Sequence, residues 1–223
     1  MSAAATSSCI GDAERVHAYI LANPHEKVAL LCEKTIVQWV FGDCSFLPPI
    51  ESKNKSADTA VYKKLEDAWG QDILKRRRPD LKLEKQWTNK FGEYIVEEIH
   101  HLLGKSPSKP SVKDHLQPDW ETDSHILEVK TQTFYTTGTA GEMVMGTPFK
   151  YAEVPVLYGK PLHIVCVGGI EALGRNQYGF LVGPQCTPGR RALLDIWKES
   201  RIEFLAATDL LLSLLPPRHP SDS

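Results

Sequence analysis

The chain has 223 residues, of which 42% are hydrophobic and 24% are charged, and its formal net charge is −2. That length permits one substantial hydrophobic core or at most two small domains. The balance of charges excludes a protein that holds nucleic acid by overall charge alone, because such proteins are strongly basic.

The cysteines and the hydropathy of the chain indicate a reducing compartment. Five cysteines are present, an odd number, and no two of them form a Cys-x-x-Cys pair. This pattern argues against a disulfide framework and against a structural zinc site. The first residues lack the basic and apolar regions of a signal peptide, and no stretch reaches the ~18 apolar residues that span a bilayer. We therefore expect a soluble, cytoplasmic protein with no membrane partner.

The first 55 residues are predicted to form an N-terminal helical segment. Apolar residues recur at helical spacing over 12–21, and Asn23-Pro24 resembles a helix start with Pro at the first helical position. A second helix is predicted over 25–40, stopping at Gly42. Residues 1–55 are therefore a candidate subdomain, 56–215 the main domain, and 216–223 a disordered tail.

Two longer helices are predicted next. The first covers 56–78, with Ser56 as its candidate N-cap. The second covers 88–104 and is closed by Gly104. It carries a stripe of apolar side chains at helical spacing, which are Phe91, Ile95, Ile99, Leu102 and Leu103.

The period of the apolar residues changes from helical spacing to alternation after the polar connection 105–118. Residues 125–134 alternate and are rich in β-formers, and 161–169 form a nearly continuous apolar run typical of a buried strand. A helix over 187–200, a strand over 202–207 and a last helix from Thr208, its candidate cap, complete the pattern. This order predicts an α/β domain with a mixed central sheet flanked by helices.

A charged triplet lies inside the first of these strands. Glu128 and Lys130 are two residues apart and so project from the same face, while Val129 points into the packing and leaves its carbonyl near the same edge. Residues 120–125 can turn back as a hairpin and would then bring Asp119 beside Glu128. Two carboxylates, a carbonyl and an ammonium are predicted to meet at one point.

That combination of groups suits hydrolysis of a phosphodiester. Carboxylate and carbonyl oxygens are the ligands that Mg²⁺ prefers, which here are Asp119, Glu128 and the carbonyl of Val129. Lys130 can orient or deprotonate the attacking water, and its charge favours the developing dianion. The alternative interpretation is an exposed, ion-paired strand face next to an ordinary Pro-Asp turn.

Pro118-Asp119 followed by Glu128-Val129-Lys130 resembles the signature of the PD-(D/E)xK nuclease superfamily, most closely its type II restriction endonucleases. The resemblance implies a restriction-endonuclease-like core and Mg²⁺-dependent cleavage of double-stranded DNA. It also implies catalytic roles for Asp119, Glu128 and Lys130. Many members add a Glu on the helix before the hairpin, for which Glu93 ranks slightly ahead of Glu98.

Two segments are candidate DNA contacts. Residues 75–90 contain seven Lys and Arg against two acidic residues, and Thr- and Gly-rich residues 133–151 directly follow the catalytic strand. For residues 75–90 the alternative is a solvated helix end. For residues 133–151 it is a loop with a short helix, in which the glycines only mark turns. The side chains proposed for contact are Lys75, Arg76, Arg77, Arg78, Thr137, Thr139, Lys150 and Tyr151.

The leading functional hypothesis is a site-specific DNA endonuclease of restriction type. An enzyme that cuts a palindrome usually has two-fold symmetry, so we expect a homodimer. One alternative is a structure-specific repair or junction-resolving nuclease of the same fold. Another is a non-catalytic DNA-binding module. The intact set of Asp, Glu and Lys counts against it, because a site without catalytic activity has no reason to bury uncompensated charges.

Overall fold

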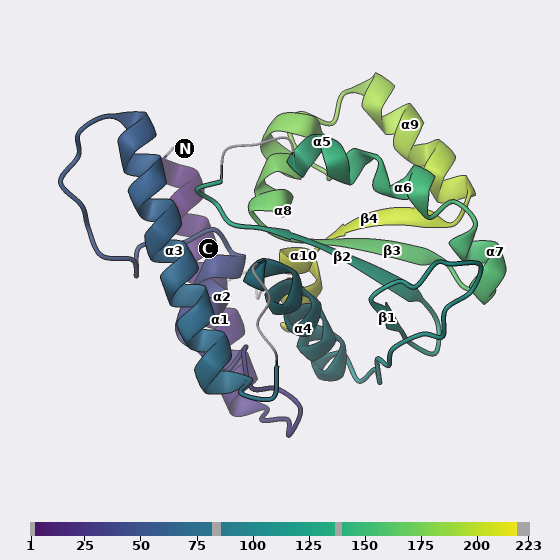
Figure 1. Ribbon diagram of the computed structural model, residues 1–223, viewed down its shortest axis with the longest axis horizontal. Helices are drawn as coiled ribbons and strands as arrows, with labels where there is room; N and C mark the ends of the chain where they lie inside the picture. The colour runs from purple at the N-terminus through teal and green to yellow at the C-terminus, as the bar shows by residue number, and fades with distance from the viewer. Residues whose placement is uncertain (1–2, 82–85, 137–139, 218–223) are drawn as a thin grey trace.

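A four-stranded mixed sheet forms the centre of the protein, in a computed structural model that describes residues 3–81, 86–136 and 140–217. The strand order is β1-β2-β3-β4, with β1 antiparallel to β2 and the other neighbours parallel (Figure 1). The strands are β1 (Trp120–Glu121), β2 (Ile126–Gln132), β3 (Leu162–Gly168) and β4 (Ile202–Ala206). The predicted α/β class with a mixed sheet is confirmed.

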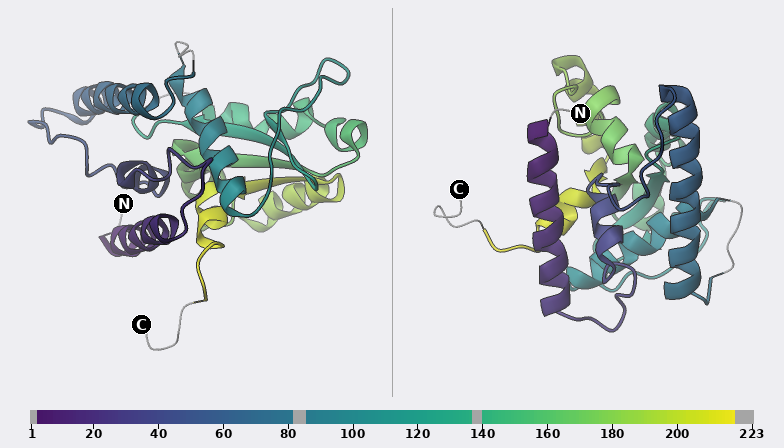
Figure 2. Two further views of the ribbon diagram at one scale, coloured as in Figure 1. Left: turned by 90° about the horizontal axis from the view of Figure 1, so that it is seen from below. Right: turned by 90° about the vertical axis from the view of Figure 1, so that its left-hand side faces the viewer.

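Helices pack on both sides of this sheet (Figure 2). Those before the sheet are α1 (Ala3–Ala22), α2 (Lys34–Val40), α3 (Lys55–Arg77) and α4 (Trp87–Leu102). Those within and after it are α5 (Ala140–Met145), α6 (Thr147–Lys150), α7 (Val154–Tyr158), α8 (Gly169–Leu173), the π-helical turn η1 (Gly174–Tyr178), α9 (Pro188–Glu199) and α10 (Ala207–Leu212). No helix of the described ranges is long and apolar enough to cross a bilayer.

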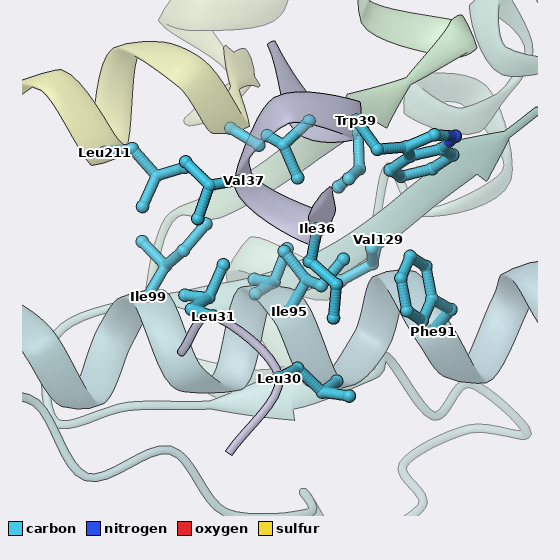
Figure 3. Close-up of a cluster of buried hydrophobic side chains, with 14 of the residues drawn as sticks. Leu30, Leu31, Ile36, Val37, Trp39, Phe91, Ile95, Ile99, Val129 and Leu211 are labelled. Carbon is cyan, nitrogen blue, oxygen red and sulfur yellow. The ribbon is translucent and has the colours of Figure 1, made fainter. Parts of the chain in front are cut away.

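The N-terminal helices share one core with the sheet and with α4. Val37 of α2, Ile99 of α4 and Leu211 of α10 lie together in this cluster, and Val129 of β2 closes its sheet side (Figure 3). The apolar stripe of α4 makes this possible, because its central residues Phe91, Ile95 and Ile99 are fully buried. Residues 13–46 therefore contribute to the main core and do not form a core of their own, while residues 218–223 of the predicted tail lie outside the described residues.

The predicted helix over 25–40 is wrong in its first half. Turns occupy 23–33, and the helix begins only at Lys34. The backbone N–H groups of Ala29, Leu30 and Leu31 are satisfied by the carboxylate of Glu98 from α4 and not by helical carbonyls. A long-range acceptor has replaced the local one, which the amino-acid pattern of this segment does not reveal.

Two predicted helix caps are also wrong. α3 is capped by Asn54, whose Oδ1 accepts from the N–H of Ala57 at 2.9 Å, and Ser56 lies inside the helix. The hydroxyl of Thr208 in α10 donates to Glu171. Short polar side chains compete for the same role within a few residues, so the pattern alone finds the helix more reliably than its first residue.

A stacked pair of histidines, one in β3 and one directly before β2, is expected to make the fold sensitive to acid. The ring of His163 in β3 stacks on His125 at 4.0 Å between centroids, and burial, with the neighbouring histidines His125 and His100, lowers the pKa of His163 to about 4. The folded protein therefore favours the neutral ring, and this contribution to stability is lost as pH falls from 6.5 towards 4. We expect His163→Phe to lose less unfolding free energy over that interval than the wild type, by up to about 3 kcal/mol. Urea denaturation at pH 7.5 and pH 4 measures this difference, and parallel losses in both proteins would contradict it.

Candidate functional site

The first strand is so short that it leaves most of the edge of β2 open. β1 pairs Trp120 with Leu127 and Glu121 with Ile126, which confirms the predicted hairpin. Beyond this point Asp119, directly before β1, takes the place of a neighbouring strand. Its carboxylate accepts the N–H of Val129 at 2.7 Å.

That hydrogen bond also fixes the direction of the Val129 carbonyl. The N–H and C=O of one strand residue point to the same side, so the carbonyl of Val129 faces the open edge near Asp119. The side chain of Val129 is buried in the core, as expected. Glu128 and Lys130 project together from the other face of the strand, with 2.5 Å between the ammonium and a carboxylate oxygen. The structure thus brings Asp119, Glu128 and Lys130 into the lining of one cavity at this edge.

Of the two candidate helix acids, Glu93 lies at the site. Its carboxylate receives the ammonium groups of Lys90 at 2.9 Å and Lys109 at 3.0 Å, and Lys109 also donates to the backbone carbonyl of Asp119 at 2.8 Å. Lys109 thereby ties α4 to the start of the hairpin. The carboxylate of Glu98 faces the turns at 29–31 instead and has a structural role.

Burial and the neighbouring carboxylates act together on the pKa of Asp119. Burial, followed by the negative charges of Glu128 and Glu93, raises the pKa of Asp119 to about 7, although the N–H of Val129 opposes the shift. Buried carboxylates that repel one another are stabilised by a cation. The oxygens of Asp119, Glu128 and the Val129 carbonyl therefore fit Mg²⁺, which keeps several waters and needs few protein ligands. Among the described residues, no three His, Cys, Asp or Glu side chains are already placed so that they could hold a metal ion together.

A cavity of about 830 Å³ opens over these groups. Asp119, Glu128, Lys130 and Glu93 all line it. Its lining comes from α3 and α4, from α5 and α6, and from β2. Figure 1 shows β2 running between these two groups of helices. Of two further lysines in its wall, Lys63 is paired with Asp67 of the same wall, and Lys150 adds positive charge suited to a polyanion.

The candidate DNA contacts are distributed differently from the prediction. Arg76 and Arg77 pair with Glu33, at 3.1 and 2.7 Å, and Arg78 pairs with Asp80. Lys75 is exposed on α3, and none of these four basic residues lines the cavity. Lys150 does line it, while Tyr151 is buried in the core beneath. Thr137 and Thr139 lie outside the described residues.

Lys109 and Gln132 are the site residues that the sequence did not single out. Lys109 stands in a polar connection without periodicity, so no local signal assigns it a partner. Gln132 carries a detectable signal, since it is the next residue of the Glu128 and Lys130 face at the strand period of two.

Gly92 sets the distance between α4 and β2. A Cβ atom at this position would lie 1.6 Å from the Oγ1 of Thr131, so only glycine permits the contact. We expect Gly92→Ala to lower the free energy of unfolding by about 2 kcal/mol and to displace Glu93 from the cavity. Gly11→Ala is the matched control, because Gly11 in α1 has no atom within 4 Å of its Cβ position. Equal stabilities of the two variants in urea denaturation would contradict this account of the contact.

No family model, characterised protein or solved structure matches this chain. The functional argument therefore rests on the residues and their geometry.

Proposed function

We propose that this chain is a Mg²⁺-dependent, site-specific endonuclease that hydrolyses phosphodiester bonds of double-stranded DNA. In this proposal it is a homodimer with a restriction-endonuclease-like core of the PD-(D/E)xK type. The observation that carries the proposal is the meeting of the Asp119 carboxylate with the Glu128–Lys130 pair at the open edge of β2, inside one cavity. The motif in the sequence and the contacts in space agree.

Each group has a chemical task in the proposed reaction. Asp119, Glu128 and the Val129 carbonyl would hold Mg²⁺, which supplies charge neutralisation and an acidic bound water. Lys130 lies against Glu128 and presents its ammonium to the cavity, where it orients a water for attack and stabilises negative charge on the phosphate. Glu93 holds Lys90 and Lys109 and keeps the wall of the site in place.

The burial of the site also favours a catalytic role over the alternative of an exposed, ion-paired strand face. Glu128 is only 4% exposed, and its carboxylate lies within a cavity that Asp119 and Glu93 also line. Glu128 is paired with Lys130, and Glu93 with Lys90 and Lys109, so the half-buried carboxylate of Asp119 is the charge whose burial costs free energy unless a bound cation offsets it. A non-catalytic module would gain nothing from this cost.

The test is incubation of the protein with Mg²⁺ and a plasmid of known sequence. We expect discrete fragments whose ends map to one short sequence, and no fragments when EDTA is present. A continuous smear would contradict site specificity, and cleavage of branched DNA alone would favour a structure-specific nuclease. Intact DNA of every kind would contradict a nuclease altogether.

A further inference from the structure

Asp119 is held at two points, only one of which lies within its hairpin. Its carboxylate accepts the N–H of Val129 at 2.7 Å, which fixes the side chain against the open edge of β2. Its backbone carbonyl accepts the ammonium of Lys109 at 2.8 Å, from the irregular connection ten residues earlier in the chain. Lys109 therefore fixes the backbone from which the Asp119 carboxylate projects.

Three groups set the place of this ammonium. Besides the carbonyl of Asp119, it contacts the carboxylate of Glu93 at 3.0 Å and lies 4.1 Å from the centre of the Trp120 ring. The indole N–H of Trp120 in turn donates to the backbone carbonyl of Glu93 at 2.9 Å. Two oxygens and an aromatic face all attract a cation, so the ammonium is restrained by three contacts. Lys109 thus joins α4 to the start of the hairpin directly beside Asp119.

Neither stability nor direct chemistry accounts for this arrangement. The Lys109 side chain is 45% exposed, and an ion pair with such exposure contributes little to stability. Lys109 is not among the described residues that line the cavity, so it does not meet a substrate bound there. What its contacts do achieve is a fixed position of Asp119 relative to Glu93 and α4.

We propose that Lys109 is a positioning residue, which acts on the proposed hydrolysis through the backbone of Asp119. The inference rests on the proposed function, since it concerns the step that Asp119 and Glu128 would support with Mg²⁺. That step requires the attacking water and the phosphate to be aligned, and a misplacement of about 1 Å costs about a hundredfold in rate. Lys109 keeps Asp119 within that tolerance.

Positioning and charge predict different effects of removing this ammonium. A positive charge beside the carboxylates weakens their attraction for a divalent cation, so its loss alone would strengthen Mg²⁺ binding and leave the rate at saturating Mg²⁺ unchanged. The loss of positioning lowers that rate instead. It leaves Mg²⁺ bound, because Asp119 keeps its hydrogen bond to Val129 at the edge of β2.

The experiment compares Lys109→Met, which keeps most of the length of the side chain without its charge, with Lys113→Met. Lys113 stands in the same connection, donates to the carbonyl of Leu157 at 3.1 Å and lies 4.5 Å from the centre of the Tyr158 ring. It therefore contacts a carbonyl and an aromatic ring as Lys109 does, but at residues that do not line the cavity. Plasmid cleavage over a range of Mg²⁺ concentrations gives the rate at saturation and the concentration at half-saturation. We expect Lys109→Met to lower the rate at saturation about 10- to 100-fold without raising the concentration at half-saturation. Lys113→Met is expected to match the wild type in both.

Two measurements without DNA complete the test. Calorimetric titration with Mg²⁺ is expected to show that Lys109→Met binds the ion no more weakly than the wild type. Thermal unfolding is expected to give similar melting temperatures for Lys109→Met and Lys113→Met, because both variants lose an ammonium that contacts a carbonyl and a ring.

The outcomes separate this inference from the proposed function. An unchanged rate at saturation in Lys109→Met, or an equal loss of rate in Lys113→Met, overturns the positioning role and leaves the nuclease standing. Weaker Mg²⁺ binding by Lys109→Met, or a melting temperature far below that of Lys113→Met, also overturns it, because Lys109 would then hold the metal ligands or the fold together. A wild type that cuts no DNA in Mg²⁺ overturns the nuclease itself, and this inference with it.

Discussion

Replacing Asp119 with Asn is expected to lower the rate of DNA cleavage about a thousandfold while the fold stays intact. The amide oxygen of Asn can still accept the N–H of Val129, which Asp119 now accepts at 2.7 Å. The geometry of the open edge is therefore kept, and only the negative charge is lost. Cleavage of a plasmid by equal amounts of the two proteins in Mg²⁺ measures the effect.

The stability of this variant gives an independent check. Because the pKa of Asp119 rises to about 7 in the fold, its ionised form opposes folding, and stability without a divalent cation falls as pH rises towards 7. Asp119→Asn removes that charge, so at pH 8 without a divalent cation we expect it to unfold at a temperature no lower than the wild type. Asp123→Asn is the matched control, since Asp123 is exposed on the same hairpin, and it should cut like the wild type. Full cleavage by Asp119→Asn would remove Asp119 from the catalytic site.

Much of the sheet could be predicted because its signals are local. The alternation around Glu128 and Lys130 gives the strand and the shared face, and the turn before it gives the hairpin that delivers Asp119. The helix α4 follows from its apolar stripe, and Gly104 ends it with a φ of 72°, as the pattern predicted. Each of these features is decided by residues that lie within about twelve positions of one another in the sequence.

The features that were missed depend on partners far away in the chain. The turns at 23–33 hold their shape through a carboxylate that comes from α4, and Lys109 reaches Glu93 and Asp119 from an irregular connection. For the basic residues 75–78 the sequence leaves a DNA contact and a solvated helix end open, and it does not reveal that Arg76 and Arg77 pair with Glu33. A charged side chain gives no sign in the sequence of which opposite charge it will meet.

Glu97 and Glu98 show this limit most clearly, and they provide the largest expected effect on stability. The two acids are neighbours on α4, yet Glu98 is buried and accepts the N–H groups of Ala29, Leu30 and Leu31 at 2.8–2.9 Å. Glu98→Ala leaves three buried donors without an acceptor. We expect it to lower the free energy of unfolding by about 4 kcal/mol, measured by urea denaturation.

Glu97→Ala is the matched control, because Glu97 is part-exposed and forms an ion pair with Arg78 at 3.9 Å. Such a pair contributes at most about 1 kcal/mol, so this variant should stay near the wild type. Glu98→Gln should fall between the two, since one amide oxygen can still accept while the NH₂ group faces other donors. Equal losses for Glu97→Ala and Glu98→Ala would mean that the turns at 23–33 are held by apolar packing alone, and that the carboxylate beneath them is replaceable.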